Sequence, residues 1–357
     1  MNTTVSASPN HIPVRPDWLA THDEPVLAPA LPIIDSHHHL YDRPGIRYLL
    51  DDYLADVGSG HNVRASVFVQ ARAMLPVGVP SELQPIGEVE FVNGVAAMSA
   101  SGIYGDTRVC AGIVGFADLK LGDRVRPILE RLIMAGGGLI SGGGRFCGIR
   151  QTLCWDADTP LLNSAYPTTE DMVDDAAFRA GFARLAPLGL SFEVWAFFHQ
   201  LDTVARLARA FPETQIVVNH CGGVLRVRNY AERSDVFDRW KAGITELAAC
   251  PNVFIKLSGL GMKMSGFGFE DAPQAPSSQT LAEAWRQWIE HCIESFGARR
   301  SMYGSNFPVD KGSYGFKVGL NALKRLTSAA SEAEKDDIFW RTAKSFYRLA
   351  DTAVISA

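Results

Sequence analysis

The chain has 357 residues, of which 47% are hydrophobic and 20% charged, so it can bury a large core as two ordinary domains or as one large α/β domain. Its net charge of −5 and its lack of a basic cluster argue against a nucleic-acid partner. The first thirty residues have no signal-peptide pattern, and no segment approaches the roughly 20 apolar residues that span a bilayer, so we expect a cytoplasmic protein without a membrane partner.

Short β-branched or aromatic runs alternate with segments of helical periodicity, a pattern typical of parallel strands joined by crossover helices. The predicted strands are residues 31–38, 65–71, 109–116, 146–151, 190–198, 215–220, 253–259 and 301–306. The predicted helices cover 88–100, 124–135, 176–188, 201–211, 236–248 and 281–296. Eight strands favour a single-domain α/β fold, the (β/α)8 TIM barrel. The rival, a doubly wound open sheet, usually has a glycine-rich turn after its first strand, where this chain has histidines.

We expect residues 1–30 to be an N-terminal extension that wraps the barrel or stays loose, and residues 31–350 to be the barrel domain. In such barrels the chemistry sits at the carboxyl ends of the strands. Two segments after strands, 152–175 and 259–280, are unusually long. We interpret them as lids in which Trp155, with Met262, Met264 and Phe267, lines an apolar substrate pocket. The alternative is that these residues only anchor their own loops.

Three consecutive histidines end the first predicted strand in IIDSHHHLYD, residues 33–42. Side chains alternate along a strand, so His37 and His39 share a face while His38 points to the opposite one. Two imidazoles on one face can converge on one ion, and neutral imidazole suits zinc. We expect His38 to pack against a helix or a loop.

Two more histidines stand at strand ends. His199 follows the fifth strand in FFHQL, and His220 ends the sixth in VVNHCGG. Four histidines from three strand ends are predicted to meet at one barrel mouth, the alternative being a coincidence of structural histidines. The other four are treated as ordinary surface or helix residues: His11, His22, His61 and His291.

The eighth strand ends in YGSNFPVDK, residues 303–311. A hydrolytic metal site normally needs a carboxylate there, to accept a proton as water attacks. This chain has Asn306, and an amide cannot be that base. Asp310 is the nearest carboxylate, and it either bends into the mouth or is a solvated residue at a helix start.

Three further polar residues occur in apolar strands. Arg150 in FCGIRQ suits bidentate binding of a substrate carboxylate, and Lys256 in VFIKLSG is a second candidate. Either residue can instead form a buried ion pair, for example with Glu193. Gln70, at the end of the second strand, is predicted to hydrogen-bond a substrate at the rim.

These motifs, in this order from about residue 31 to 350, resemble the amidohydrolase-related, metal-dependent hydrolases of the TIM-barrel fold, in the branch that contains sugar-acid and dicarboxylate lactonases. The resemblance implies that His37, His39 and His199 bind a divalent metal, with zinc the expected ion, and that His220 polarises the substrate or water. It also implies hydrolysis of a C–O or C–N bond, with lactones as typical substrates. Asn306 departs from the family pattern, which has an aspartate at this position, and some relatives resemble metal-independent lactonases.

We therefore predict a hydrolase that opens a lactone or similar ester of a small carboxylated molecule, with attack by activated water. Two alternatives stay open. One is a metal-dependent decarboxylase of a carboxylated aromatic, and the other is a barrel that binds a ligand without catalysis. Barrels of this size often pair, so a homo-oligomer is also open, and the sequence marks no interface.

Overall fold

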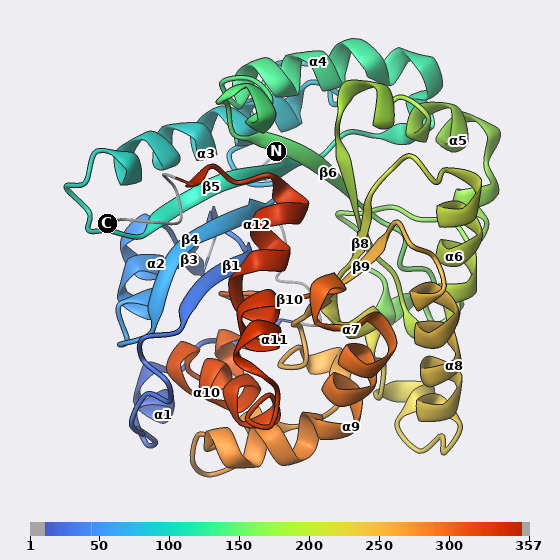
Figure 1. The fold of residues 1–357 in the computed structure, drawn as a ribbon. Coiled ribbons are helices and arrows are strands. Elements are labelled where there is room, and N and C mark those ends of the chain that lie inside the picture. Colours follow the sequence, from blue (N-terminus) through green and yellow to red (C-terminus); the bar gives the residue numbers. More distant parts are fainter. Residues whose placement is uncertain (1–10, 44, 352–357) are drawn as a thin grey trace.

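Eight parallel strands form the sheet of this computed structural model, which describes residues 11–43 and 45–351 (Figure 1). The order of neighbouring strands is β1-β4-β5-β6-β7-β8-β9-β10, and a separate two-stranded sheet pairs β2 with β3. The strands are β1 (Pro32–His38), β2 (Tyr41–Arg43), β3 (Ile46–Tyr48), β4 (Asn62–Val69), β5 (Arg108–Gly115), β6 (Phe146–Thr152), β7 (Ser191–Trp195), β8 (Ile216–Val218), β9 (Val253–Leu257) and β10 (Ser301–Tyr303). All eight predicted strands are therefore confirmed, and so is the α/β barrel.

Helices surround the sheet on its outer side (Figure 1). They are α1 (Pro16–Leu19), α2 (Leu50–Val57), α3 (Gln84–Ala100), α4 (Arg126–Ala135), α5 (Ala176–Phe182), α6 (Leu201–Ala210), α7 (His220–Gly223), α8 (Val236–Ala248), α9 (Ser278–Phe296), α10 (Phe316–Leu326), α11 (Glu332–Asp336) and α12 (Thr342–Tyr347). Each of the six predicted helices is present, although α5 is shorter than the predicted 176–188. The short helices α1 and α7, helix α2 and the helices that follow β10 were not predicted.

The barrel closes where the ends of β1 and β10 meet. The backbone N–H of His39 donates to the carbonyl of Phe307, and that of Asn306 donates to the carbonyl of His37, each at 2.8 Å. Asp35 reinforces this junction because its carboxylate accepts hydrogen bonds from the backbone N–H of Ser305 at 2.8 Å and from the Ser305 hydroxyl at 2.6 Å. The carboxyl end of β1, with its histidines, is thereby fixed to the segment that carries Asn306.

Apolar side chains fill the barrel interior, among them Ile34, Val67 and Met302. Helix α12 adds Phe346 and Tyr347 to the same cluster, and Phe346 packs against Phe254 near the start of β9. In Figure 1 the C-terminal helices, in red, cross in front of β1 and β10. The amino ends of the strands are thus covered, and the carboxyl ends remain as the mouth.

The part of the N-terminal extension that the structure describes, residues 11–30, packs on α10 and on the loop that precedes α9. Leu27 N–H donates to the side-chain oxygen of Asn321 at 2.8 Å, and the indole N–H of Trp18 donates to the carbonyl of Ala272 at 2.9 Å. Of the two expectations for the extension, wrapping around the barrel holds for residues 11–30. Residues 1–10 lie outside the described part. The domain boundaries at 30 and 350 stay predictions.

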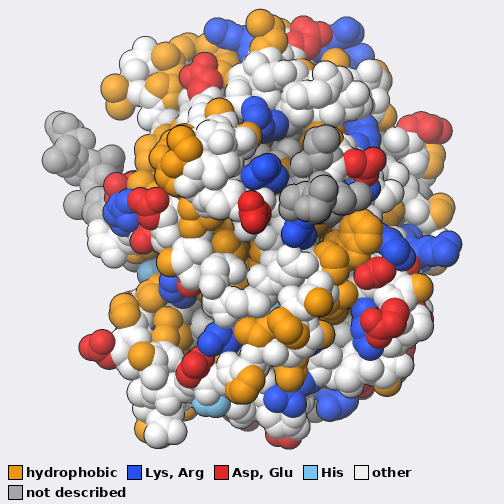
Figure 2. Space-filling model, turned by 60° about the vertical axis from the view of Figure 1, so that its left-hand side comes forward, with side chains coloured by type: hydrophobic (Ala, Val, Ile, Leu, Met, Phe, Trp, Pro, Cys, Tyr) orange, Lys and Arg blue, Asp and Glu red, His pale blue; other side chains and the backbone are white. Residues whose placement is uncertain are grey.

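Within the described ranges, no helix combines the length and the apolar character needed to cross a membrane. On the face shown in Figure 2, acidic and basic side chains lie interspersed with apolar and neutral ones.

Candidate functional site

Three of the four predicted histidines lie together at the barrel mouth. The ring centroid of His37 is 4.9 Å from that of His39 and 4.6 Å from that of His220, and the two Nε2 atoms of His37 and His39 are 3.3 Å apart. Strand β1 supplies the first and the residue just after it the second, while His220 follows β8. Burial holds the pKa of all three imidazoles well below the ordinary value, with neighbouring cations lowering it further. The histidines are therefore neutral at physiological pH.

The hydrogen bonds of the pair indicate which ring nitrogens carry protons. His39 Nδ1 lies 2.7 Å from the carbonyl oxygen of Val69, so it donates and its Nε2 carries the lone pair. His37 faces the ammonium of Lys256 at Nδ1 (3.3 Å) and the guanidinium of Arg150 at Nε2 (3.2 Å). A neutral imidazole accepts one hydrogen bond in its plane. One of the two cations therefore has an N–H directed at His37 without an acceptor.

Lys256 forms the buried ion pair that the sequence analysis left open. Its ammonium lies 2.8 Å from both carboxylate oxygens of Glu193 and 2.7 Å from the carbonyl of Ser36, and both side chains of the pair are fully buried inside the barrel. Tyr347 donates its hydroxyl hydrogen to the same carboxylate. Burial lowers the pKa of Lys256 to about 8, so the ammonium still carries its proton at pH 7. No contact in the structure supports the predicted substrate-binding role of Lys256, which stays a prediction.

Arg150 is also buried, but in the described part of the chain it has no carboxylate partner. Its guanidinium donates to the carbonyl of Gln70 and approaches His37, while its Nε has no hydrogen-bond partner. The side-chain amide nitrogen of Gln70 is likewise buried without a partner, and its oxygen accepts from Tyr166 at 3.4 Å. Buried donors are normally satisfied, so unpaired N–H groups beside the histidines indicate that an acceptor binds here. Substrate binding by Arg150 and Gln70 remains a prediction that this geometry favours.

His220 is held in an uncommon conformation at the end of β8. Its φ is 57°, the next residue, Cys221, has a φ of 50°, and both glycines that follow also have positive φ, so α7 is a left-handed turn. The ring Nδ1 lies 3.0 Å from the hydroxyl of Ser258, and the ring packs edge-on against Trp195 with centroids 4.7 Å apart. Among described residues the Nε2 of this imidazole has no hydrogen-bond partner. It is therefore free to act on a substrate.

His199 does not join the other three. It lies in the short 3-10 helix Phe198–Gln200, where its Nε2 is 3.1 Å from the carbonyl of Trp155 and 3.5 Å from the carboxylate of Asp156. The ring stacks on Tyr230 with centroids 5.7 Å apart. These contacts hold His199 against the loop after β6. The backbone of Trp155 takes part in this packing, while its predicted role in a substrate pocket stays untested.

Asn306 and Asp310 are both buried at the end of β10. The amide Nδ2 of Asn306 donates to Asp310 at 2.7 Å, and the other carboxylate oxygen of Asp310 accepts from the Tyr314 hydroxyl at 2.8 Å. Burial raises the pKa of Asp310 to about 7. The alternative that Asp310 is a solvated helix-start residue is wrong, because its side chain turns inward to collect these donors. The catalytic role predicted for the two residues is not tested by these contacts.

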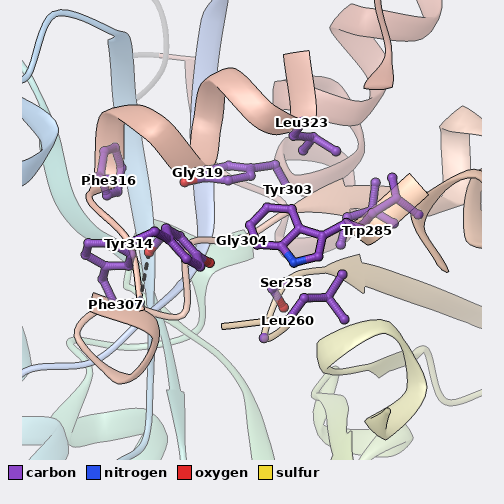
Figure 3. Close-up of a pocket in the computed structure, with 14 residues that line it drawn as sticks. Ser258, Leu260, Trp285, Tyr303, Gly304, Phe307, Tyr314, Phe316, Gly319 and Leu323 are labelled. Atoms are coloured by element: carbon purple, nitrogen blue, oxygen red, sulfur yellow. Dashed lines mark hydrogen bonds between the residues drawn. The ribbon is translucent and has the colours of Figure 1, made fainter. Parts of the chain in front are cut away.

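A mostly apolar cavity lies behind this part of the mouth, between β9, β10 and helices α9 and α10. It opens partly to solvent, and about 390 Å³ of the space in and around it is not filled by atoms. Figure 3 shows Trp285 and Tyr314 projecting into it, with Ser258 at its edge. Because Ser258 contacts His220 and Tyr314 contacts Asp310, the cavity borders both polar groups of the site.

Of the other histidines, His38 lies where it was predicted and His61 does not. His38 packs on the α2 residue Tyr53 with ring centroids 4.1 Å apart and lies 2.9 Å from the Ser66 hydroxyl, as predicted for a residue facing a helix. His61 is a correction: it is buried, not on the surface, because Lys324 donates to its Nδ1 at 2.9 Å beneath the N-terminal segment.

A divalent metal does not fit the residues in this arrangement. His39 has the orientation of a ligand, since its Nδ1 is bound to a carbonyl and its Nε2, 3.3 Å from that of His37, carries the lone pair. However, His37 faces cations at both nitrogens, and Asn306 turns its NH₂ group toward Asp310. Within the described ranges, no three His, Cys, Asp or Glu side chains are grouped so that they could hold a metal ion. We therefore derive no step through a metal.

Several site residues were missed by the sequence analysis. Trp195 and Tyr166 have no charge or spacing that marks them, and only their places at the end of β7 and in the long segment 152–175 hint at a role. Asp35 lies two residues before His37, but it joins β1 to β10, which the sequence does not reveal.

Comparisons with known proteins agree with this architecture. The family model described as Amidohydrolase matches residues 34–349. An uncharacterised protein of Sinorhizobium fredii is 30% identical, over 89% of this chain and 98% of its own length. An L-fucono-1,5-lactonase of Burkholderia multivorans is 25% identical, over 90% of this chain and 97% of its own length. A crystal structure of an amidohydrolase from Burkholderia multivorans with bound zinc is 25% identical, with a TM-score of 0.68 over 89% of this chain and 99% of that one.

Proposed function

This chain belongs to the amidohydrolase family, and from that premise we propose that it hydrolyses a lactone or similar ester of a small carboxylated molecule. One observation carries the proposal: Arg150, a buried guanidinium with a free Nε and no carboxylate partner in the described chain, lies beside three neutral histidines. A carboxylate or an oxyanion is the group that such a donor binds. The similarity to an L-fucono-1,5-lactonase supports a lactone as the ester.

In this proposal the protein's own residues carry the reaction. Arg150 and the amide nitrogen of Gln70 donate to the substrate carbonyl oxygen as it becomes an oxyanion. Water attacks the carbonyl carbon, and its proton moves to the free Nε2 of His220, whose Nδ1 is held at 3.0 Å from Ser258. The proton then passes to the ring oxygen as the C–O bond breaks, so that the products are a carboxylic acid and an alcohol.

Zinc binding, which the sequence analysis predicts and a relative shows, requires a rearrangement here. His37 can become a ligand only if Arg150 moves away from its Nε2, and His199 must leave the Trp155 carbonyl. We therefore expect purified protein to contain far less than one zinc per chain and its hydrolysis rate to survive a chelator. Elemental analysis measures the zinc content, and lactone turnover before and after chelation measures the rate, with stoichiometric zinc and loss of activity as the contrary result.

The function itself is tested with a panel of sugar-acid and dicarboxylate lactones and a pH indicator that reports the acid released. We expect turnover by the wild type, and a fall in kcat/KM of about 100-fold or more for Arg150→Met and His220→Asn. His291→Asn, at a partly exposed site on α9, is the matched control and should leave the rate unchanged. No turnover of any lactone or ester, with or without added metal, overturns the proposal.

The same assays separate the alternatives. Release of CO₂ from an aromatic acid indicates a decarboxylase, since a lactonase leaves such acids unchanged. Tight binding of a lactone without turnover indicates a barrel that only binds its ligand.

A further inference from the structure

Asn306 occupies a fixed position at the rim beside His37. Its φ of 57° is in the left-handed region, which asparagine tolerates better than most residues, and its backbone N–H is bound to the His37 carbonyl at 2.8 Å. Its Nδ2 donates to Asp310 at 2.7 Å. Because the side-chain amide is planar, its carbonyl oxygen is directed away from Asp310.

The Asp310 carboxylate accepts hydrogen bonds from uncharged donors. The groups bound to its carboxylate are all donors: Asn306 Nδ2, the hydroxyl of Tyr314, the backbone N–H of Gly261 at 3.2 Å and the backbone N–H of Gly259. The side chain is fully buried, and in the described part of the chain it has no cationic partner. Such a site binds a carboxylate through neutral donors and determines the orientation of the Asn306 amide.

We propose that Asn306 and Asp310 work as one unit, in which Asp310 is a positioning residue that holds the Asn306 carbonyl oxygen as the acceptor for the attacking water. This inference rests on the proposed function. The water donates one hydrogen bond to that oxygen and gives its other proton to His220 as its oxygen bonds to the substrate carbon. Asn306 exchanges no proton, so the step balances with His220 as the base.

The alternative is that Asp310 has only a structural role and joins the loop after β9 to Tyr314. The two readings differ in what happens when the partners are exchanged. The double variant Asn306→Asp/Asp310→Asn keeps one amide, one carboxylate and the hydrogen bond between them, and it keeps an acceptor oxygen at position 306. Asn306→Asp alone places two carboxylates at hydrogen-bond distance, and Asp310→Asn alone removes the anchor that orients the amide.

We expect each single variant to lower kcat/KM on the best lactone by about tenfold or more, and the double variant to recover to within about threefold of wild type. Unfolding by urea, measured on all four proteins, shows whether the pair is coupled in stability as well. Recovery of stability without recovery of kcat shows a structural clamp and overturns the inference. A rise in kcat for Asn306→Asp alone also overturns it, since the native amide would then be a disabled base.

The pH dependence of kcat/KM is a further test, because a purely structural role of Asp310 would not change it. Tyr314 and Tyr303 are the titratable groups that face Asp310, from the segment before α10 and from β10. The Tyr314 hydroxyl lowers the pKa of Asp310, so Tyr314→Phe should shift the acid limb of kcat/KM to higher pH. An unmoved limb contradicts the inference. Wild-type turnover is measured first, so that an inactive wild type, which defeats the proposed function and the inference together, is distinguished from failure of the variants alone.

Discussion

At the scale of single residues, Gly259 determines how closely the backbone can approach His220. A Cβ atom at this position would lie 2.5 Å from the His220 ring, and the φ of Gly259 is +75°. Gly259→Ala should therefore displace the imidazole and lower kcat/KM by about tenfold or more, with a loss of stability of about 1–3 kcal/mol. Steady-state kinetics and urea unfolding measure the two effects.

The matched control is Gly268→Ala, in the same loop. Gly268 has a similar φ of +67°, but a Cβ there meets nothing closer than 3.8 Å. Gly268→Ala should lower the free energy of unfolding, because alanine is strained at this φ, but it should leave kcat/KM unchanged. Equal kinetic losses in both variants would mean that contact with His220 is not the cause.

Lys256 offers a second test, of the charge inside the barrel. Lys256→Met leaves Glu193 buried without its cation, and breaking such a pair typically costs about 3–5 kcal/mol. Adding Glu193→Gln removes the unpaired charge, so the double variant should be more stable than Lys256→Met alone. Lys335→Met, which breaks a surface pair, is the control, and urea unfolding is the measurement. A loss below 1 kcal/mol for Lys256→Met would contradict the expectation.

The sequence predicts the positions of strand-end residues better than the directions of their side chains. His37, His39 and His220 meet as predicted because each stands at the carboxyl end of a barrel strand or directly after it. His199 follows β7 by the same rule, but the chain enters a 3-10 helix at Phe198, and that turn directs its ring toward Tyr230. Such a turn depends on tertiary packing, and the sequence pattern does not encode it.

At the scale of elements, helix α3 holds the segment that follows β4. Glu88 of α3 accepts hydrogen bonds from the backbone N–H groups of Ala71 and Ala73, at 2.9 and 2.8 Å, and its second oxygen has no partner. That segment begins with Gln70, whose carbonyl binds Arg150. The helix therefore supports the donors of the site from outside the barrel.

Burial raises the pKa of Glu88 from 4.5 to about 7. Between these values the folded protein keeps a proton that the unfolded chain has released, so the contribution of Glu88 to the free energy of unfolding falls as pH rises. Glu88→Gln retains an acceptor for both N–H groups and does not titrate. Over this interval wild type should lose about 3 kcal/mol more than Glu88→Gln.

Urea unfolding at pH 4.5 and pH 7 measures the difference, and Glu90→Gln on the exposed face of α3 is the control. Parallel pH dependence in wild type and Glu88→Gln would show that the carboxyl titrates in its ordinary range. This role could not be predicted from the sequence, because Glu88 lies in a helix where an acidic residue is normally solvated.

Most elements could be predicted because strands and helices follow different periodicities. The helix α10 was not predicted, and two of its residues, Gly319 and Asn321, are explained only by packing: Gly319 lies against Tyr314, and Asn321 binds the N-terminal segment. The short strands β8 and β10 were recognisable only as members of a series of eight. Tertiary contacts thus decide the elements that local pattern leaves undetermined.

At the scale of the whole molecule, function depends on closure of the barrel between its first and last strands. The two backbone hydrogen bonds at this junction, to the carbonyls of His37 and Phe307, fix the relative positions of the histidine pair and Asn306. The sequence predicts a closed barrel from the number of strands, but it does not show that a carboxylate secures the junction. Asp35 does so, with four donors: the backbone and side chain of Ser305, the Tyr53 hydroxyl and the backbone of His37.

Asp35→Asn tests whether the junction stabilises the whole barrel or only its rim. Asparagine has an NH₂ group in place of one carboxylate oxygen, so some of the four donors lose their acceptor. We therefore expect the free energy of unfolding in urea to fall by about 3 kcal/mol. If closure is cooperative, hydrogen exchange should accelerate by the same factor at the amides of β1, β10 and the distant β6. Acceleration confined to the amides of His39 and Asn306 would instead show a local opening of the rim. Asp123→Asn, at an exposed surface pair, is the control and should change neither quantity, because a screened surface contact contributes little to folding.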